Sequence, residues 1–145
     1  MNQYLLIIDN NTISRYEEHY FRKYPKRKKN PIENPTHPSI NQWMIMKRQM
    51  MNDLKGKWKD FIVWFVEDQK MSNMKIEKCN MTFISYFRTK VMKDVDNTVP
   101  KFILDGFVEG GLIIDDNYLH LESITLKCGY SKENPRTEIY IYVEE

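Results

Sequence analysis

Residues 94–116 read DVDNTVPKFILDGFVEGGLIIDD, with a pair of aspartates at each end and an apolar pattern between them. The apolar residues recur at i, i+3, i+4 and i+8, as one face of a helix requires, at Val99, Phe102, Ile103 and Phe107. This pattern predicts a helix from about Thr98 to Glu109, and Gly110-Gly111 supplies its end. A helix of this length can return the second aspartate pair to the neighbourhood of the first.

The four aspartates that flank this helix are candidate ligands for a divalent cation. Asp94 and Asp96 are two residues apart, so on extended backbone their side chains point to the same side. Asp115 and Asp116 follow the helix. Converging carboxylate oxygens are the ligands that Mg²⁺ and Mn²⁺ prefer. In a chain with a basic N-terminal half, such a site suggests phosphodiester chemistry.

A purely structural interpretation is equally compatible with the composition of these segments. Asp94 and Asp96 are of a residue type that caps helices. Asp115-Asp116-Asn117 has the composition of a turn. Lys101 lies at the positive end of the predicted helix, where a cation is mildly disfavoured. Because a residue that breaks a local rule often belongs to a functional site, Lys101 is a candidate for contact with a phosphate.

The length and composition predict a single folded domain over residues 1–145. Apolar residues make up 41% and aromatic residues 13% of the chain, which argues against disorder. Residues 1–60 hold 12 Lys/Arg against 6 Asp/Glu, whereas residues 61–145 hold 10 against 14. This asymmetry favours a polyanion-binding surface beside a cation site, unless the fold mixes the two halves.

The sequence also predicts the compartment. Cys79 and Cys128 form no CxxC pair, which is typical of a reduced, cytosolic protein. The N-terminus lacks the positive region of a signal peptide, and no segment approaches the roughly 20 apolar residues of a membrane-spanning helix. We therefore expect a soluble protein with no membrane partner.

The element pattern predicts a small α/β domain, α+β-like, with a mixed or antiparallel sheet and two main helices. Ser39 is expected to cap the first helix, which runs from Ile40 to Phe65. Asp9-Asn10-Asn11 has the composition of a turn that ends the first strand. Strand composition marks four segments: Tyr4–Ile8, Met81–Phe87, Leu119–Cys128 and Glu138–Val143.

Residues 12–38 are expected to form a long, mobile, basic surface loop, because prolines interrupt the segment. Its basic side chains would neutralise phosphates, and nearby aromatic rings would stack on bases. A solvated loop without a ligand is the competing interpretation. The candidate DNA-binding residues are Arg15, Arg22, Lys23, Lys26, Arg27, Lys28 and Lys29.

The motif set in residues 90–145 resembles the signature of the RusA family of Holliday junction resolvases. The shared features are D-x-D-N at residues 94–97, a lysine, an apolar helix with a Leu104-Asp105-Gly106 core, a glycine and the acidic pair Asp115-Asp116. The first half of the chain resembles the family only in general form, with a strand, a basic loop and a long helix.

The resemblance implies a RusA-like, homodimeric, Mg²⁺-dependent endonuclease that resolves four-way DNA junctions by paired symmetric nicks in recombination and repair. It would place metal binding on Asp94, Asp96 and Asp116, with Asp115 as neighbour or substitute. Lys101 would be the catalytic lysine. Many members of the family are phage-borne, and the expected location is the cytoplasm of a bacterial cell.

Lys101 lies five residues after Asp96, one more than in the best-known members of the family. One residue rotates a helical position by about 100°, so the role of Lys101 depends on whether the extra residue precedes the helix. Two other functions are compatible with this departure. One is a less selective metal nuclease that acts on branched DNA, and the other is a DNA-binding protein without catalytic activity.

Overall fold

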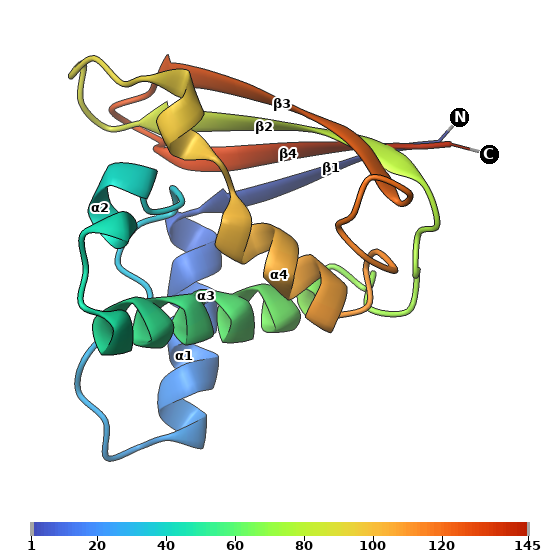
Figure 1. Cartoon of the computed structure of the whole chain (residues 1–145). Coiled ribbons are helices and arrows are strands. Elements are labelled where there is room, and N and C mark those ends of the chain that lie inside the picture. Colours follow the sequence, from blue (N-terminus) through green and yellow to red (C-terminus); the bar gives the residue numbers. More distant parts are fainter. Residues whose placement is uncertain (1, 145) are drawn as a thin grey trace.

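Four strands form one mixed sheet, and the longer helices cover one of its faces (Figure 1). The computed structural model describes residues 2–144, and its α+β architecture agrees with the predicted fold class. In chain order the elements are β1 (Asn2–Asp9), α1 (Asn10–Lys23), α2 (Ile40–Met44), α3 (Arg48–Asp68), β2 (Cys79–Phe87), the 3₁₀ turn η1 (Val95–Thr98), α4 (Lys101–Glu109), β3 (Leu121–Tyr130) and β4 (Arg136–Val143).

The strand order in the sheet is β1-β4-β2-β3. β2 and β3 are parallel and are joined through η1 and α4, whereas β4 is antiparallel to both β1 and β2. β3 and β4 are consecutive in sequence but are separated in the sheet by β2. Because β1 pairs with β4, Asn2 lies opposite Val143, and the start of β1 is beside the end of β4 (Figure 1).

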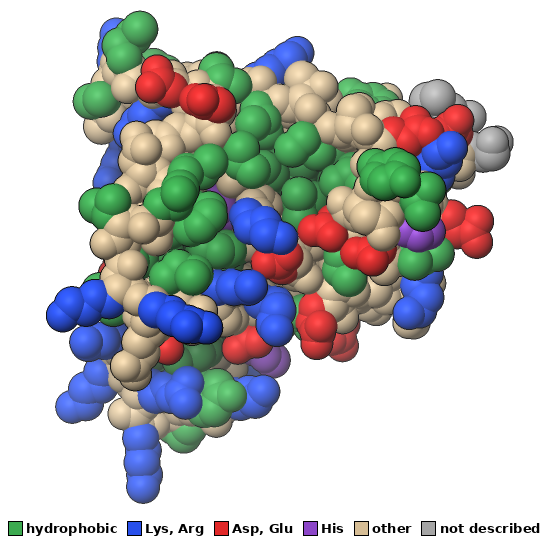
Figure 2. All heavy atoms as spheres, in the orientation of Figure 1, with side chains coloured by type: hydrophobic (Ala, Val, Ile, Leu, Met, Phe, Trp, Pro, Cys, Tyr) green, Lys and Arg blue, Asp and Glu red, His purple; other side chains and the backbone are tan. Residues whose placement is uncertain are grey.

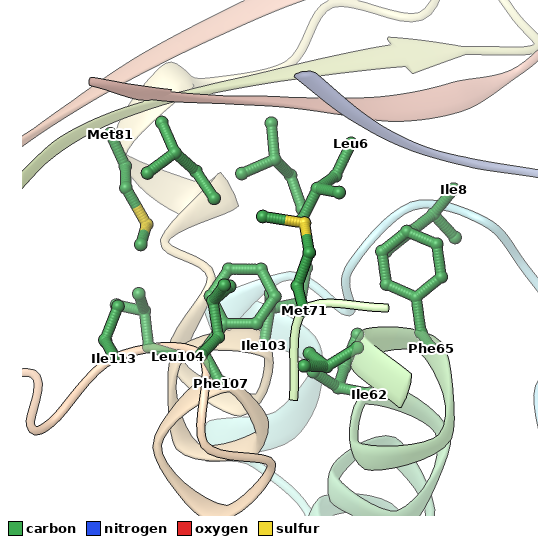
Figure 3. Close-up of a cluster of buried hydrophobic side chains, with 14 of the residues drawn as sticks. Leu6, Ile8, Ile62, Phe65, Met71, Met81, Ile103, Leu104, Phe107 and Ile113 are labelled. Carbon is green, nitrogen blue, oxygen red and sulfur yellow. The ribbon is translucent and has the colours of Figure 1, made fainter. Parts of the chain in front are cut away.

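The core lies between the sheet and the helices α3 and α4 (Figure 3). Ile62 and Phe65 of α3 and Ile103 and Phe107 of α4 are fully buried. Gly106 allows the two helices to approach closely, since a Cβ at this position would overlap the side chain of Ile62. This packing fixes the position of α4, and therefore of Lys101 at its first turn.

The N-terminal half of the predicted loop at residues 12–38 is helical, so that prediction is wrong for Thr12–Lys23. Asp9 does not begin a turn: its side chain accepts a hydrogen bond from the Thr12 amide, and Thr12 reciprocates as in a capping box. Ile13 and Tyr16 are buried one helical turn apart. The signal was present in the Asp9-x-x-Thr12 spacing and in the i, i+3 apolar pair.

The C-terminal half of the same segment is irregular but packs against the protein. Ile32 is 2% exposed, and His37 is 6% exposed. The His37 Nε2 atom accepts a hydrogen bond of 2.9 Å from the Phe102 amide, and its Nδ1 lies 2.7 Å from the Pro38 carbonyl oxygen. The hydroxyl of Thr137 donates to the Pro35 carbonyl oxygen at 2.7 Å. This segment therefore supports the start of α4.

The long helix predicted from Ile40 to Phe65 is divided into α2 and α3. The predicted cap is correct, because the Ser39 hydroxyl accepts from the Gln42 amide at 3.2 Å. The break follows from tertiary contacts: Trp43 of α2 packs on Phe102 with ring centroids 5.4 Å apart. Within residues 2–144, no helix is long and apolar enough to span a bilayer.

Candidate functional site

The backbone of Asp94 is extended, as the spacing suggested, but the backbone of Asp96 is part of the 3₁₀ turn η1. Asp94 is the N-terminal flanking residue of this turn, and Asp96 lies within it. Both side chains are exposed. The Asn97 side chain fixes the turn to α2 by accepting a hydrogen bond of 3.0 Å from the Asn41 amide. The first acidic pair therefore faces solvent from a turn that α2 holds in place.

α4 begins at Lys101, so the extra residue between Asp96 and the lysine lies in the connecting turn and does not rotate the helix. The Lys101 Nζ atom lies 3.1 Å from Asp105 Oδ1, one turn along α4. It also lies 3.9 Å from Asp116 Oδ2. The lysine ammonium is thus held between two carboxylates that come from different segments.

Asp105 was not among the predicted site residues, although it belongs to the Leu104-Asp105-Gly106 core. Its side chain is 18% exposed. The Oδ2 atom is buried and finds no hydrogen-bond partner within residues 2–144, and Lys55 Nζ lies 3.9 Å from it. The i, i+4 spacing from Lys101 was the available signal for this role.

The two aspartates of the second acidic pair, Asp115 and Asp116, make different contacts. Asp115 makes the turn, because its Oδ1 accepts from the Asp116 amide at 2.8 Å and its Oδ2 accepts from the Asn117 side chain at 3.1 Å. Asp116 instead directs Oδ2 toward Lys101. The turn that the composition suggested therefore describes Asp115 well, and Asp116 is the member of the pair that lies beside Lys101.

The two acidic pairs do not converge on one point. Residues 2–144 contain no group of three or more His, Cys, Asp or Glu side chains arranged to hold a metal ion. The donor chemistry nevertheless suits Mg²⁺, which is often held by one or two carboxylates together with water and substrate phosphates. Asp94 and Asp96 supply two exposed carboxylates of this kind.

A cleft of about 780 Å³ opens beside Asp94. Its walls come from the 30–39 segment, from the first half of α3 and from the residues that connect β2 to η1. Basic side chains line it at Lys57, Arg88 and Lys93, and Asn97 contributes an amide. The cleft therefore combines polar and cationic walls with an acidic rim.

The predicted DNA-binding residues differ in how their charges are used. The Arg15 guanidinium is paired with both carboxylate oxygens of Asp68 at 2.8 Å. Arg27 donates to the Tyr20 hydroxyl at 2.8 Å and lies 3.9 Å from the Tyr24 ring centroid. The other five are Arg22, Lys23, Lys26, Lys28 and Lys29. Figure 2 shows basic side chains gathered over the lower left of the molecule, where α1 and the start of α3 lie.

A comparison with protein-family models identifies the chain. Residues 10–142 match the model of the endodeoxyribonuclease RusA. The match includes the acidic pairs, Lys101 and Asp105, and it extends over the first half of the chain, where the motifs alone gave little indication. No curated protein gives a significant match. The chain belongs to the RusA family of endodeoxyribonucleases, which are Holliday junction resolvases.

Proposed function

We propose that this protein is a Mg²⁺-dependent endonuclease that resolves four-way DNA junctions by paired, symmetric nicks. The observation that supports the proposal most directly is the position of Lys101. Its ammonium lies within 3.9 Å of both Asp105 and Asp116 at the first turn of a buried helix. A lysine held in this way is a preorganised cation for a phosphate whose charge grows in the transition state.

Mg²⁺ or Mn²⁺ would be held by Asp94 and Asp96, with water and a DNA phosphate as further ligands. When bound, such an ion activates water and stabilises the leaving oxygen in phosphodiester hydrolysis. Asp116 would belong to the same catalytic group through its contact with Lys101. Asp115 would act on the metal only indirectly, because both of its oxygens accept hydrogen bonds within the turn.

The residues of the chain itself contribute orientation and charge. The carboxylates of Asp105 and Asp116 attract the Lys101 ammonium from two sides and would restrain its position. The buried face of α4, locked against α3 at Gly106, restricts movement of the lysine backbone. His37 accepts from the Phe102 amide and so satisfies one of the otherwise unpaired amides at the start of α4. These contacts hold the cation where a scissile phosphate would dock.

DNA binding would use the basic cluster at the C-terminal end of α1 and in the loop that follows. Lys26, Lys28 and Lys29 are exposed, so their charges are free to contact phosphates. Lys57 connects this cluster to the cleft beside Asp94, because it lines both the cleft and the smaller hollow next to Lys28. A continuous basic path would then lead from the cluster to the acids.

A homodimer is part of the proposal, since two symmetric nicks require two active sites related by a two-fold axis. The exposed apolar side chains of α2 and of the start of α3 offer contact area: Met44 is 67% and Met50 is 57% exposed. Gel filtration with light scattering over a range of concentrations tests this part of the proposal separately from cleavage.

The decisive experiment incubates the protein with a mobile four-way junction and Mg²⁺ and maps the nicks on all four strands. We expect paired nicks at symmetric positions, and faster cutting of the junction than of flap or linear duplex DNA. Asp96→Asn should abolish cleavage and retain junction binding. Equal rates on all three substrates would indicate a less selective nuclease, and binding without any cleavage in Mg²⁺ or Mn²⁺ would indicate a non-catalytic DNA-binding protein.

A further inference from the structure

The loop formed by residues 88–94 carries an exposed apolar tip next to the acidic site. Met92 is 93% exposed and Val91 is 65% exposed, although both are apolar. In Figure 1 this loop, between β2 and η1, extends beyond the end of the sheet. It ends at Asp94, two residues after Met92. The two apolar residues therefore lie close in sequence to Asp94, a proposed metal ligand, with only Lys93 between Met92 and Asp94.

Basic residues surround this tip, and two of them are held against aromatic rings at the strand ends. Three of the seven loop residues are Lys or Arg. Lys90 Nζ lies 5.2 Å from the Tyr130 ring centroid, and Lys93 Nζ lies 5.1 Å from the Phe87 ring centroid. These contacts flank the Val91-Met92 pair on both sides. The pair consequently projects outward while the neighbouring charges stay at the base of the loop.

The base of the loop borders the cleft, because Arg88, Lys93 and Asp94 form part of the cleft wall, and the Val91-Met92 tip lies in the same loop. DNA that follows the cleft toward Asp94 would meet the apolar pair at the end of its path. Apolar side chains, including methionine, are inserted between base steps by DNA-binding proteins that kink or unstack a duplex. Base steps at the centre of a four-way junction are interrupted, so unstacking costs less there than within continuous duplex.

We infer that Met92, supported by Val91, is a wedge that inserts between bases at the branch point of the junction and opens it beside the acidic site. The inference rests on the proposed function and extends that function by a specific contact between the protein and the bases of the junction. The competing occupant of the tip is a second copy of this chain. In a two-fold interface at the tip, Arg88, Lys90 and Lys93 would lie close to the same three cations of the second copy and would repel them. DNA phosphates are negative and would attract these cations instead, so DNA is the better occupant.

The test uses four-way junctions that carry 2-aminopurine at the branch point, since the fluorescence of this adenine analogue rises when it loses its stacking partners. The wild-type protein is added without divalent metal, so that binding occurs without cleavage. We expect fluorescence to rise on binding, and we expect Met92→Ser to remove at least about half of the rise. Leu119→Ser is the matched control, because Leu119 is 62% exposed in a segment, residues 114–120, that contains no lysine or arginine.

The outcomes separate the wedge from the proposed function. If the wild-type protein cleaves junctions in Mg²⁺ but Met92→Ser and Leu119→Ser both give the wild-type fluorescence rise, the wedge is wrong and the nuclease assignment stands. If Met92→Ser lowers the dimer fraction in gel filtration and leaves the fluorescence rise intact, the tip is a dimer contact and the wedge is wrong. Failure of the wild-type protein to bind junctions at all would overturn both.

Discussion

Lys101 Nζ lies 3.1 Å from Asp105 Oδ1, and the two residues are one turn apart on α4. The pairing matters because Asp105 is largely buried and its Oδ2 finds no hydrogen bond within residues 2–144. A buried carboxylate with an unsatisfied oxygen costs stability, so a purely structural role would be better served by a neutral side chain. We therefore propose that the lysine and its carboxylate partner act as one functional unit.

Asp105→Asn should reduce cleavage without weakening junction binding. The substitution keeps the size of the side chain but removes the charge that orients the Lys101 ammonium. We expect kcat to fall by about 10- to 100-fold, with KM unchanged, because misplacement of a catalytic group by about 1 Å has effects of this size. Single-turnover kinetics on a fixed junction, together with a binding titration, would measure both quantities.

Glu109→Gln is the matched control for Asp105→Asn, because Glu109 is an exposed acid on the same helix. It should leave kcat and KM near the wild-type values. Equal losses of kcat in the two variants would mean that the effect arises from the charge of α4 as a whole. A loss of thermal stability in Asp105→Asn that parallels the loss of activity would point to a structural role.

The two members of the second acidic pair should respond differently to neutralisation. Asp116→Asn removes a charge that lies 3.9 Å from the Lys101 ammonium, and it should reduce cleavage by at least about 100-fold. Asp115→Asn should cost mainly stability, because the Asp115 carboxylate organises the turn. Junction cleavage and thermal unfolding of both variants would test this division, and the reverse pattern would assign the site to Asp115.

The stability of the protein should fall between about pH 6.5 and pH 4 because of His37. Burial lowers the pKa of His37 from 6.5 to about 4, while the Pro38 carbonyl and Asp105 oppose the shift only in part. Well above pH 6.5 the His37 ring is neutral in both the folded and the unfolded protein, so His37 protonation costs no stability there. As the pH falls, the unfolded state binds a proton that the folded state excludes, and the accumulated loss approaches about 3 kcal/mol near pH 4.

Urea unfolding of wild type and His37→Asn at several pH values would isolate this contribution. The difference between the two curves removes the titration of carboxylates that both proteins share. We expect the variant to be less stable at neutral pH, since it loses the bond to the Phe102 amide, and to lose less additional stability below pH 6.5. Parallel curves for the two proteins would show that His37 does not titrate as its burial implies.

Replacement of two helical glycines by alanine should change the free energy of unfolding in opposite directions. Gly106→Ala places a methyl group against Ile62 where α3 and α4 meet, and it should lower the free energy of unfolding by about 1–3 kcal/mol. Gly56→Ala has open space around it in α3 and should raise that free energy by up to about 1 kcal/mol. Chemical denaturation measures both changes. Stabilisation by Gly106→Ala would refute the close approach of the helices.

The salt dependence of junction binding should distinguish the exposed lysines from the paired arginine. Neutralising Lys26, Lys28 and Lys29 together should reduce the slope of log K against log salt by up to about 0.9 for each DNA phosphate that these lysines neutralise in the wild-type complex. Arg15→Gln should change the slope little, because Arg15 already pairs with Asp68. Binding titrations at several salt concentrations provide the slopes, and a larger change for Arg15→Gln would place DNA on α1 itself.

Local sequence patterns predicted the elements that depend on contacts between residues close to one another in the sequence. The i, i+3, i+4 pattern around Phe102 predicted α4, and the Ser39 cap predicted the start of α2, since both depend on neighbouring residues. The capping box at Asp9 was equally local but was taken for a turn, because aspartate and asparagine favour both structures. The break between α2 and α3 was not predictable from the periodicity, because it depends on the packing of Trp43 against Phe102.

The sequence by itself determined the family, and it determined the position of Lys101 relative to Asp105, because side chains four apart on a helix share one face. Only the tertiary structure decided that Asp116 rather than Asp115 meets the lysine, that β4 lies between β1 and β2, and that His37 supports α4. Each of these contacts joins residues that are distant in sequence. Such contacts depend on how the whole chain packs its core, which periodicity and spacing do not encode.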